Sequence, residues 1–324
     1  MNRCAWVSAT WLLLAAGTGP ALAQGRVEDS ARDAVYPCPK PAGAALLQEA
    51  AKLYPAKYDK NKFGCSADLF FEAAQAAPGD LALNVQALLV TTEYIDSINT
   101  LWDFDLYGIR QPEWAARVEH AVAQGRILDG RVAAGVPHDP TALAARALFQ
   151  LSAGAKTVDA KTQIAGSRQA MGQLREATAA DPSLLGGSAL LALARLYYEL
   201  PEFMGGDADE AQRLLEQGLK VAPKNPSLVR YAAFVQAQEH HVPAAKALLA
   251  LMPDLQAEPP DLQNLVDELR NARDLSMRLG DEPLRERLNQ RRDALLRQHP
   301  ELLTRASTAA NMHGGVDPIT GKPY

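Results

Sequence analysis

The sequence has few cysteines, few aromatic residues and no concentrated basic stretch. Only 3 of its 324 residues are cysteine, and aromatic residues make up 6%. Its longest apolar stretch, Ala5 to Ala16, is shorter than the about 20 residues that a membrane-spanning helix needs. The densest basic run, Arg285–Arg297, is interrupted by Glu286 and Asp293. A nucleic-acid-binding surface would gather Lys and Arg on one face, so we expect no nucleic-acid partner.

Sequence motifs for catalysis and metal binding are also absent. There is no G-x-S-x-G, no phosphate-binding glycine loop and no H-E-x-x-H, and the six histidines lack zinc-ligand spacing. Acidic pairs such as Asp207 with Asp209 lie where helix caps and turns are expected. Residues distant in the sequence could still assemble a site. The prediction is nevertheless a protein that is not an enzyme and has no cofactor or metal.

The first 23 residues have the features of a cleaved signal peptide. Arg3 gives a positive start, the apolar stretch follows, and Ala21-Leu22-Ala23 is a small-residue cleavage signal. Cleavage before Gln24 would leave 324 − 23 = 301 residues, with a net charge of about 32 − 38 = −6. We therefore expect a periplasmic protein, with a retained membrane anchor as the alternative.

Two cysteines, Cys38 and Cys65, remain after the signal peptide. An even pair in an oxidising compartment predicts a disulfide, and two buried free thiols are the alternative. The disulfide would tie the proline-rich segment YPCPKPAG to the following helix. The predicted organisation is an extended segment at residues 24–42, a helical repeat domain at residues 43–305 and an extended or disordered tail at residues 306–324.

Helical periodicity dominates the chain after this segment. Ala and Leu are abundant, β-branched runs are few, and apolar residues recur at three- and four-residue spacing, which predicts an all-α fold. Breaks containing proline or glycine separate the segments. The predicted helices are Gly43–Tyr54, Ser66–Ala76, Leu81–Ile98, Pro112–Ala134, Thr141–Gly154, Ile164–Ala180, Ser188–Leu200, Ala208–Val221, Ser227–Glu239, Pro243–Leu251, Asp261–Leu279 and Glu282–Gln298.

Two segments share the spacing of the second helix of a tetratricopeptide repeat and its closing proline. They are Ala170–Pro182, with the pattern A-x3-L-x2-A-x4-P, and Ala211–Pro223, with A-x3-L-x2-G-x4-P. The small residues let neighbouring helices approach, and the large residue between them enters the facing groove. One repeat cannot bury its apolar face alone. The chain is therefore predicted to stack tetratricopeptide-like helix-turn-helix repeats into a compact superhelix.

A long linker, PEFMGGDADEA, joins the helices of the later unit. It has about five residues more than the tetratricopeptide pattern allows. Pro201 ends the first helix, and Gly205 and Gly206 permit left-handed backbone angles. Asp207 can cap the next helix, with Glu210 in a capping-box-like arrangement. The linker is interpreted as a well-capped hairpin, or alternatively as a loop that lines an opening or a partner surface.

The stretch LARLYYELPEFMGGDADEAQRLLEQGLKVAPKNP resembles the TatT-like family, the T-component of TRAP-type periplasmic transporters. The resemblance implies a repeat superhelix around an apolar cavity or pore that holds a hydrophobic small molecule, such as a lipid or a sterol-like molecule. It also implies a periplasmic solute-binding protein or a membrane transporter as partner, and a homo-oligomer is left open. The sequence departs from the family in its cysteine pair and in lacking a lipoprotein cleavage site. The matching residues are Tyr197, Tyr198, Pro201, Gly205, Gly206, Asp207, Ala211 and Pro223.

Aromatic residues gather in the region EYIDSINTLWDFDLYGIRQPEW. Tyr and Trp combine a large apolar face with a polar group, which suits a pocket that orients an apolar ligand, and Met adapts to irregular apolar shapes. Packing where two long helices turn is the alternative. The predicted ligand-binding residues are Tyr94, Trp102, Phe104, Tyr107, Trp114, Tyr197, Tyr198, Phe203 and Met204.

The primary functional prediction is a periplasmic protein that binds or transfers a hydrophobic small molecule within a transport system. The rival prediction is a tetratricopeptide-type protein–protein scaffold. An enclosed apolar cavity lined by aromatic residues and Met would favour the carrier. An open groove lined by Lys, Arg and Asn would favour the scaffold.

Overall fold

The computed structural model describes residues 38–102, 112–157, 160–257 and 261–302. Over these residues the chain forms twelve α-helices and no strand, which confirms the predicted all-α fold. The α-helices are α2 (Ala45–Leu53), α3 (Lys60–Ala76), α4 (Leu81–Trp102), α5 (Pro112–Gly135), α6 (Pro140–Thr157), α7 (Ala160–Ala180), α8 (Ser188–Glu199), α9 (Ala208–Val221), α10 (Pro226–Gln238), α11 (Val242–Leu249), α12 (Leu262–Arg278) and α13 (Glu282–Gln298). Short 3-10 turns are η1 (Tyr54–Ala56), η3 (Leu184–Gly187), η4 (Glu202–Met204), η5 (Met252–Asp254) and η6 (Pro300–Leu302).

The helix boundaries follow local sequence signals closely. Helices α9 and α13 begin and end at the predicted residues. The prediction was wrong for the start of α3, which begins at Lys60 instead of Ser66. The reason is a cap that the apolar pattern did not reveal. The Asp59 carboxylate accepts hydrogen bonds from the backbone N–H groups of Asn61 and Lys62 and so stabilises an earlier first turn.

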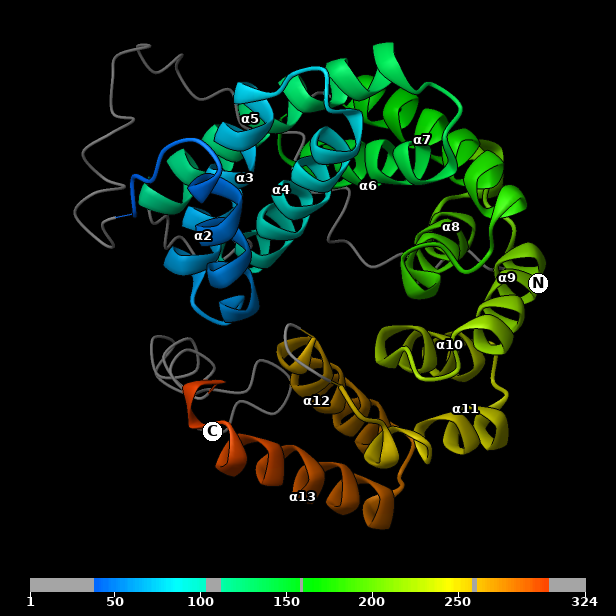
Figure 1. Ribbon diagram of the computed structural model, residues 1–324. Helices are drawn as coiled ribbons and strands as arrows, with labels where there is room; N and C mark the ends of the chain where they lie inside the picture. Colours follow the sequence, from blue (N-terminus) through cyan, green and yellow to red (C-terminus); the bar gives the residue numbers. More distant parts are fainter. Residues whose placement is uncertain (1–37, 103–111, 158–159, 258–260, 303–324) are drawn as a thin grey trace.

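Successive helices pack in pairs along a curved arc (Figure 1). The pairs are α2–α3, α4–α5, α6–α7, α8–α9, α10–α11 and α12–α13. From α4 onward the first helix of each pair lies toward the inside of the arc and the second toward the outside (Figure 1). We call the inward side of α4, α6, α8, α10 and α12 the inner face.

The small residues of the repeat pattern lie where neighbouring helices approach closely, as the pattern predicted. Ala170, Ala177 and Ala211 are fully buried between helices. A Cβ atom on Gly218 would lie 2.9 Å from Cδ1 of Leu228, so α9 and α10 approach closely enough that a larger residue would require the Leu228 side chain to move. The apolar interior is divided into three clusters in chain order, within α2–α6, α6–α10 and α10–α13. This sequential core is typical of stacked repeats.

The linker between α8 and α9 folds into a closed turn. Gly205 has a left-handed φ of 101°, and a Cβ atom on Gly206 would lie 1.7 Å from the carbonyl oxygen of Leu200. The Asp207 carboxylate accepts from the N–H groups of Asp209 and Glu210, which confirms the predicted cap. The capping box itself is not formed. Glu210 instead pairs with Arg213 at 2.6 Å, because the Asp207 N–H already donates to a backbone carbonyl.

Cys38 and Cys65 form the predicted disulfide, with their Cα atoms 5.4 Å apart. It ties the segment before α2 to the middle of α3. Within the described part of the chain, none of the helices is both long enough and apolar enough to cross a membrane. The predicted signal peptide and the tail at residues 306–324 lie outside the described residues.

Candidate functional site

Polar and aromatic side chains form a continuous band across the inner face. We call this band the inner seam. It spans three first helices, α8, α10 and α12, and its residues contact one another across the gaps between helix pairs. The residues of the inner seam are Arg195, Tyr198, Glu199, Arg230, Tyr231, Phe234, Glu268 and Asn271.

The α8–α10 part of the seam is built around one carboxylate. The hydroxyl of Tyr231 donates to Oε1 of Glu199 at 3.0 Å, and Nε of Arg195 donates to the same oxygen at 3.2 Å. The Arg195 guanidinium also lies 5.5 Å from the centre of the Tyr231 ring. Tyr198 and Phe234 meet edge-to-face, with ring centroids 6.4 Å apart.

The α10–α12 part of the seam is a charge pair. Nε of Arg230 donates to Oε2 of Glu268 at 2.7 Å, and the side-chain amide of Asn271 donates to the same oxygen at 3.3 Å. The Glu268 side chain is only 9% exposed, against 52% for Arg195 on α8. Because breaking a largely buried pair leaves a charge without its partner, this end of the seam is the fixed end. The α8 end is the one that solvent reaches.

The two phenols of the seam and the Arg195 guanidinium keep their protons over the ordinary pH range. Burial and the neighbouring Glu239 raise the pKa of Tyr198 to about 12. Burial and Glu199 raise the pKa of Tyr231 well above its usual value. Burial alone would lower the pKa of Arg195, but Glu199 and Tyr231 raise it on balance. The neutral Tyr198 phenol and the permanent Arg195 cation can hold a partner by hydrogen bonds and ring contacts, whereas neither Tyr198 nor the buried Tyr231 is suited to transfer a proton near neutral pH.

Helical spacing explains why these residues share a face. On α8 the half-exposed or exposed positions 191, 195 and 198 follow one another at four and three residues. On α10 the half-exposed positions 227, 230 and 234 follow one another at three and four residues, with the buried Tyr231 beside them. Such positions line one side of a helix while the buried positions pack against the second helix of the pair. Our sequence interpretation named Tyr198 but missed the other seam residues. The signal that could have identified these residues is the stripe of polar and aromatic side chains at three- and four-residue spacing on the first helix of each pair.

Of the aromatic residues predicted from the central region, Tyr94 is the one whose side chain the structure describes. Tyr94 is buried in the first core cluster, where its ring meets Phe63 at 5.6 Å between centroids. Trp102 is the last residue of α4 and Trp114 belongs to the first turn of α5, but their side chains lie outside the described part. Phe104 and Tyr107 lie outside the described residues altogether.

The remaining predicted ligand-binding residues lie around the end of α8. Tyr197 and Tyr198 both pack against the second core cluster, and Tyr198 also belongs to the inner seam. Phe203 is 81% exposed on η4, and Met204 beside it is half-buried. The structure thus brings Tyr197 and Tyr198 to one cluster but places Tyr94 in another and leaves the Phe203 side chain in solvent.

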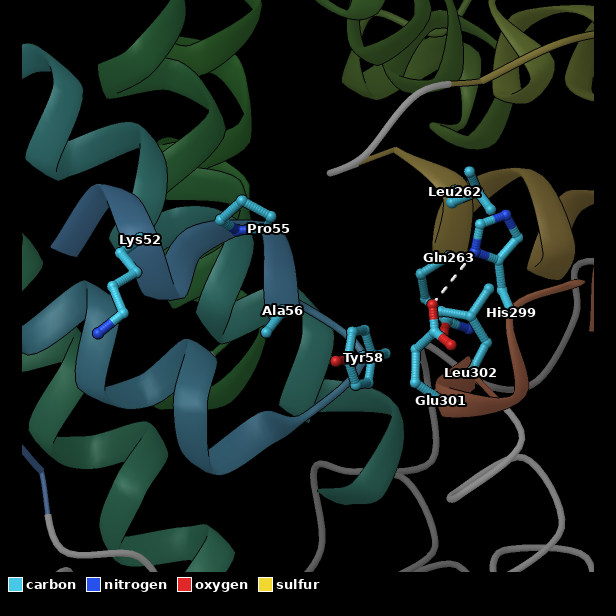
Figure 2. Close-up of a pocket in the computed structure, with 9 residues that line it drawn as sticks. All are labelled: Lys52, Pro55, Ala56, Tyr58, Leu262, Gln263, His299, Glu301 and Leu302. Carbon is cyan, nitrogen blue, oxygen red and sulfur yellow. Dashed lines mark hydrogen bonds and ion pairs between the residues drawn. The ribbon is translucent and has the colours of Figure 1, made fainter. Parts of the chain in front are cut away.

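Two hollows are described on the surface, and neither is an enclosed apolar cavity. The larger, of about 690 Å³, lies between α7 and α9 and is lined by charged side chains that include Arg175, Glu176, Glu210 and Arg213. The smaller, of about 240 Å³, lies between η1 and the start of α12 (Figure 2). Among the described residues, His, Cys, Asp and Glu form no cluster that could hold a metal ion.

A polar cluster that the sequence did not indicate joins α3 to α5. Nε2 of His120 lies 3.0 Å from Oδ1 of Asp68, and the Gln124 side-chain amide donates to the same oxygen at 2.9 Å. Asp68 is buried, so these bonds satisfy a carboxylate inside the α3–α5 contact. The residues are more than fifty positions apart, and no local motif links them.

Comparison with known protein families finds a match over part of the helical arc. A family model described as tetratricopeptide repeat matches residues 202–269, from η4 into α12. Together with the helix pairing, this match decides the coarse identity. The chain is a tetratricopeptide-like helical repeat protein. The finer resemblance to the TatT-like family is not shown by the comparisons and stays a prediction.

Among solved structures, the chain is similar to the crystal structure of a thermophilic TPR protein, TTC0263, from Thermus thermophilus. The two are 15% identical, the match covers 78% of this chain and 97% of that chain, and the TM-score is 0.43. That score is too low to support the fold assignment, which therefore depends on the family match and the helix pairs. The comparison with curated proteins found no match.

Proposed function

We propose that this protein is a non-enzymatic protein-binding module that holds a peptide segment of a partner on its inner face. The inner seam is the observation that carries the proposal. It is open at its α8 end, it offers an arginine and aromatic rings, and it lies on a surface that stacked helix pairs form. This is the scaffold that the sequence left as the rival interpretation.

Among the described residues, the two hollows do not provide the feature that the carrier interpretation needs. A carrier would remove hydrocarbon from water in an enclosed apolar cavity, but the two hollows described above are open to solvent and have charged side chains in their walls. The space between helix layers is occupied by core side chains such as Leu88, Leu174 and Leu269, all fully buried. We therefore place the hydrophobic ligand second.

The proposed location is the periplasm. The signal-peptide pattern supports it, and so does the Cys38–Cys65 disulfide, since such bonds persist in oxidising compartments. The partner is accordingly another exported protein or the exposed part of a membrane protein, and a solute-binding protein or a transporter belongs to that class.

An array of short synthetic peptides of random sequence, probed with the purified mature protein, tests the proposal. We expect a subset of peptides to bind and Arg195→Ala to weaken their binding by about tenfold or more, as removal of a central arginine anchor does. The matched control is Arg175→Ala, because Arg175 is an exposed arginine on α7 that does not belong to the inner seam.

Two results would contradict the proposal. One is peptide binding that Arg195→Ala leaves unchanged, because the inner seam would then not be the binding surface. The other is native mass spectrometry of the purified protein showing one tightly bound lipid per chain. That result would restore the carrier interpretation, especially if the lipid also raised the melting temperature.

A further inference from the structure

The two ends of the helical arc lie near each other (Figure 1). The turn that follows α2 faces the last helix pair, although the two are at opposite ends of the domain. Nζ of Lys57 lies 4.0 Å from Oδ1 of Asp261, at the start of α12. The next residue, Tyr58, packs against the third core cluster, which otherwise belongs to α10–α13. Figure 2 shows Tyr58 facing Gln263, Glu301 and Leu302.

Lys57 is held in place from the first end. Its Nζ lies 2.6 Å from Oε2 of Glu93 on α4 and 4.3 Å from the centre of the Tyr54 ring. The Lys57 side chain is only 16% exposed. Burial and Glu93 are the main causes that raise the pKa of Tyr54, and the charge of Asp261 adds to them. The ammonium group is therefore held beside the gap by residues of the first end as well as by Asp261.

Asp261 is oriented across the gap instead of along its own helix. It occupies the N-cap position of α12, yet its carboxylate accepts no hydrogen bond from the first N–H groups of that helix. Asp207 and Asn225, at the same position of α9 and α10, both make such bonds. An aspartate at this position normally caps its helix. Its direction toward Lys57 is what an attraction between the two ends would produce.

The contact between the ends is small. A hollow of about 240 Å³ remains between them, with Pro55, Ala56 and Tyr58 on one side and Leu262 and Leu302 on the other (Figure 2). The Asp261 side chain is 71% exposed. Ion pairs with an exposed partner contribute little and are screened by salt. The ends are thus in contact without being locked together.

We propose that Lys57, Tyr58 and Asp261 form a clasp that closes the helical arc into a ring, and that this clasp opens and closes in solution. Opening separates the first helix pair from the last while neighbouring pairs keep their contacts, because each repeat packs mainly on its neighbours. The width of the inner face then changes with the state of the clasp. This inference does not depend on what the inner face binds.

Small-angle X-ray scattering of the monomer tests the clasp. We expect Asp261→Asn to raise the radius of gyration at low salt by on the order of 1 Å, against the roughly 19 Å of a compact chain of this size. Asparagine caps helices as well as aspartate does, so α12 should keep its start. The wild type should approach the same open dimensions in high salt, and the variant should respond less. Asp209→Asn, the same change at an exposed position of α9, is the control and should behave as wild type.

Hydrogen exchange of the backbone N–H groups gives a second readout. In Tyr58→Ala, exchange should become faster in the turn at residues 54–58 and in the first turn of α12, with the middle of α8 unchanged. A radius of gyration and an exchange pattern that stay at wild-type values in both variants would overturn the proposal. So would wild-type dimensions that do not respond to salt, because the ion pair would then not contribute to closure.

Discussion

The backbone N–H of Asp207 donates a hydrogen bond to the carbonyl oxygen of Tyr197 at 2.8 Å. This bond brings the end of the long linker back onto the last turn of α8, ten residues earlier in the chain. The linker is therefore a closed turn that fixes where α9 begins, while Phe203 at its tip stays in solvent. Its extra length does not loosen the hairpin.

The cap of α9 should contribute measurably to stability. Asp207→Ala removes the acceptor for two backbone N–H groups and should lower the free energy of unfolding by about 1 kcal/mol. Asp207→Asn keeps an acceptor and should cost much less. Urea unfolding followed by circular dichroism measures both variants. Equal losses in the two would show that the carboxylate acts through its charge and not as a cap.

Gly206 should be sensitive to the smallest substitution. In Gly206→Ala the new Cβ would lie 1.7 Å from the Leu200 carbonyl oxygen, so the backbone of the turn must move. We expect a loss of at least about 2 kcal/mol in the free energy of unfolding. Gly166→Ala, within α7 and with open space around it, is the matched control and should gain up to about 1 kcal/mol. Thermal denaturation measures the stability of both variants. A Gly206→Ala variant as stable as the wild type would contradict the close approach of Gly206 to Leu200.

Reduction of the disulfide should destabilise the first helix pairs. Cys38 and Cys65 close a loop with a sequence separation of 27, for which the chain-entropy model gives about 3–4 kcal/mol. The melting temperature should fall when a reductant is added. A Cys38→Ser/Cys65→Ser variant should already melt at the lower temperature and show no response to the reductant. A wild type that is equally stable in both conditions would exclude a structural role for the bond.

Stability should fall at high pH because of the seam tyrosines. The pKa of Tyr198 is about 12 in the folded protein, against about 10 for tyrosine in an unfolded chain. The folded state holds the phenolic proton more tightly, so the contribution is complete below about pH 10 and is lost as the pH rises toward about 12. Tyr231, whose pKa is raised further, acts in the same direction.

Urea unfolding at increasing alkaline pH measures this slope. The Tyr198→Phe/Tyr231→Phe variant has no phenolic proton at either position, so its stability should decline less steeply above about pH 10 than that of the wild type. Equal slopes would show that these two phenols do not ionise differently in the folded and unfolded states.

Local chemistry made most helices predictable. Asn225 and Asp281 cap α10 and α13 by accepting bonds from N–H groups of their own first turns, and a cap is written in the few residues around it. The error at α3 has the same origin, since Asp59 is a local signal that the apolar pattern outweighed. The buried position of Tyr94 was harder to predict, because whether an aromatic ring lines a pocket or fills a core depends on which helix faces it.

The sequence by itself determined that this chain is a series of paired helices with tight, capped turns, because helix propensity, apolar spacing and caps act within a few residues. Only the tertiary structure decided which side chains meet across pairs. Arg230 reaches Glu268 because α10 and α12 pack side by side. Lys57 reaches Asp261 because the rotations between successive helix pairs add up along the arc. The total rotation from the first helix pair to the last depends on every contact between pairs, so no short stretch of sequence determines it.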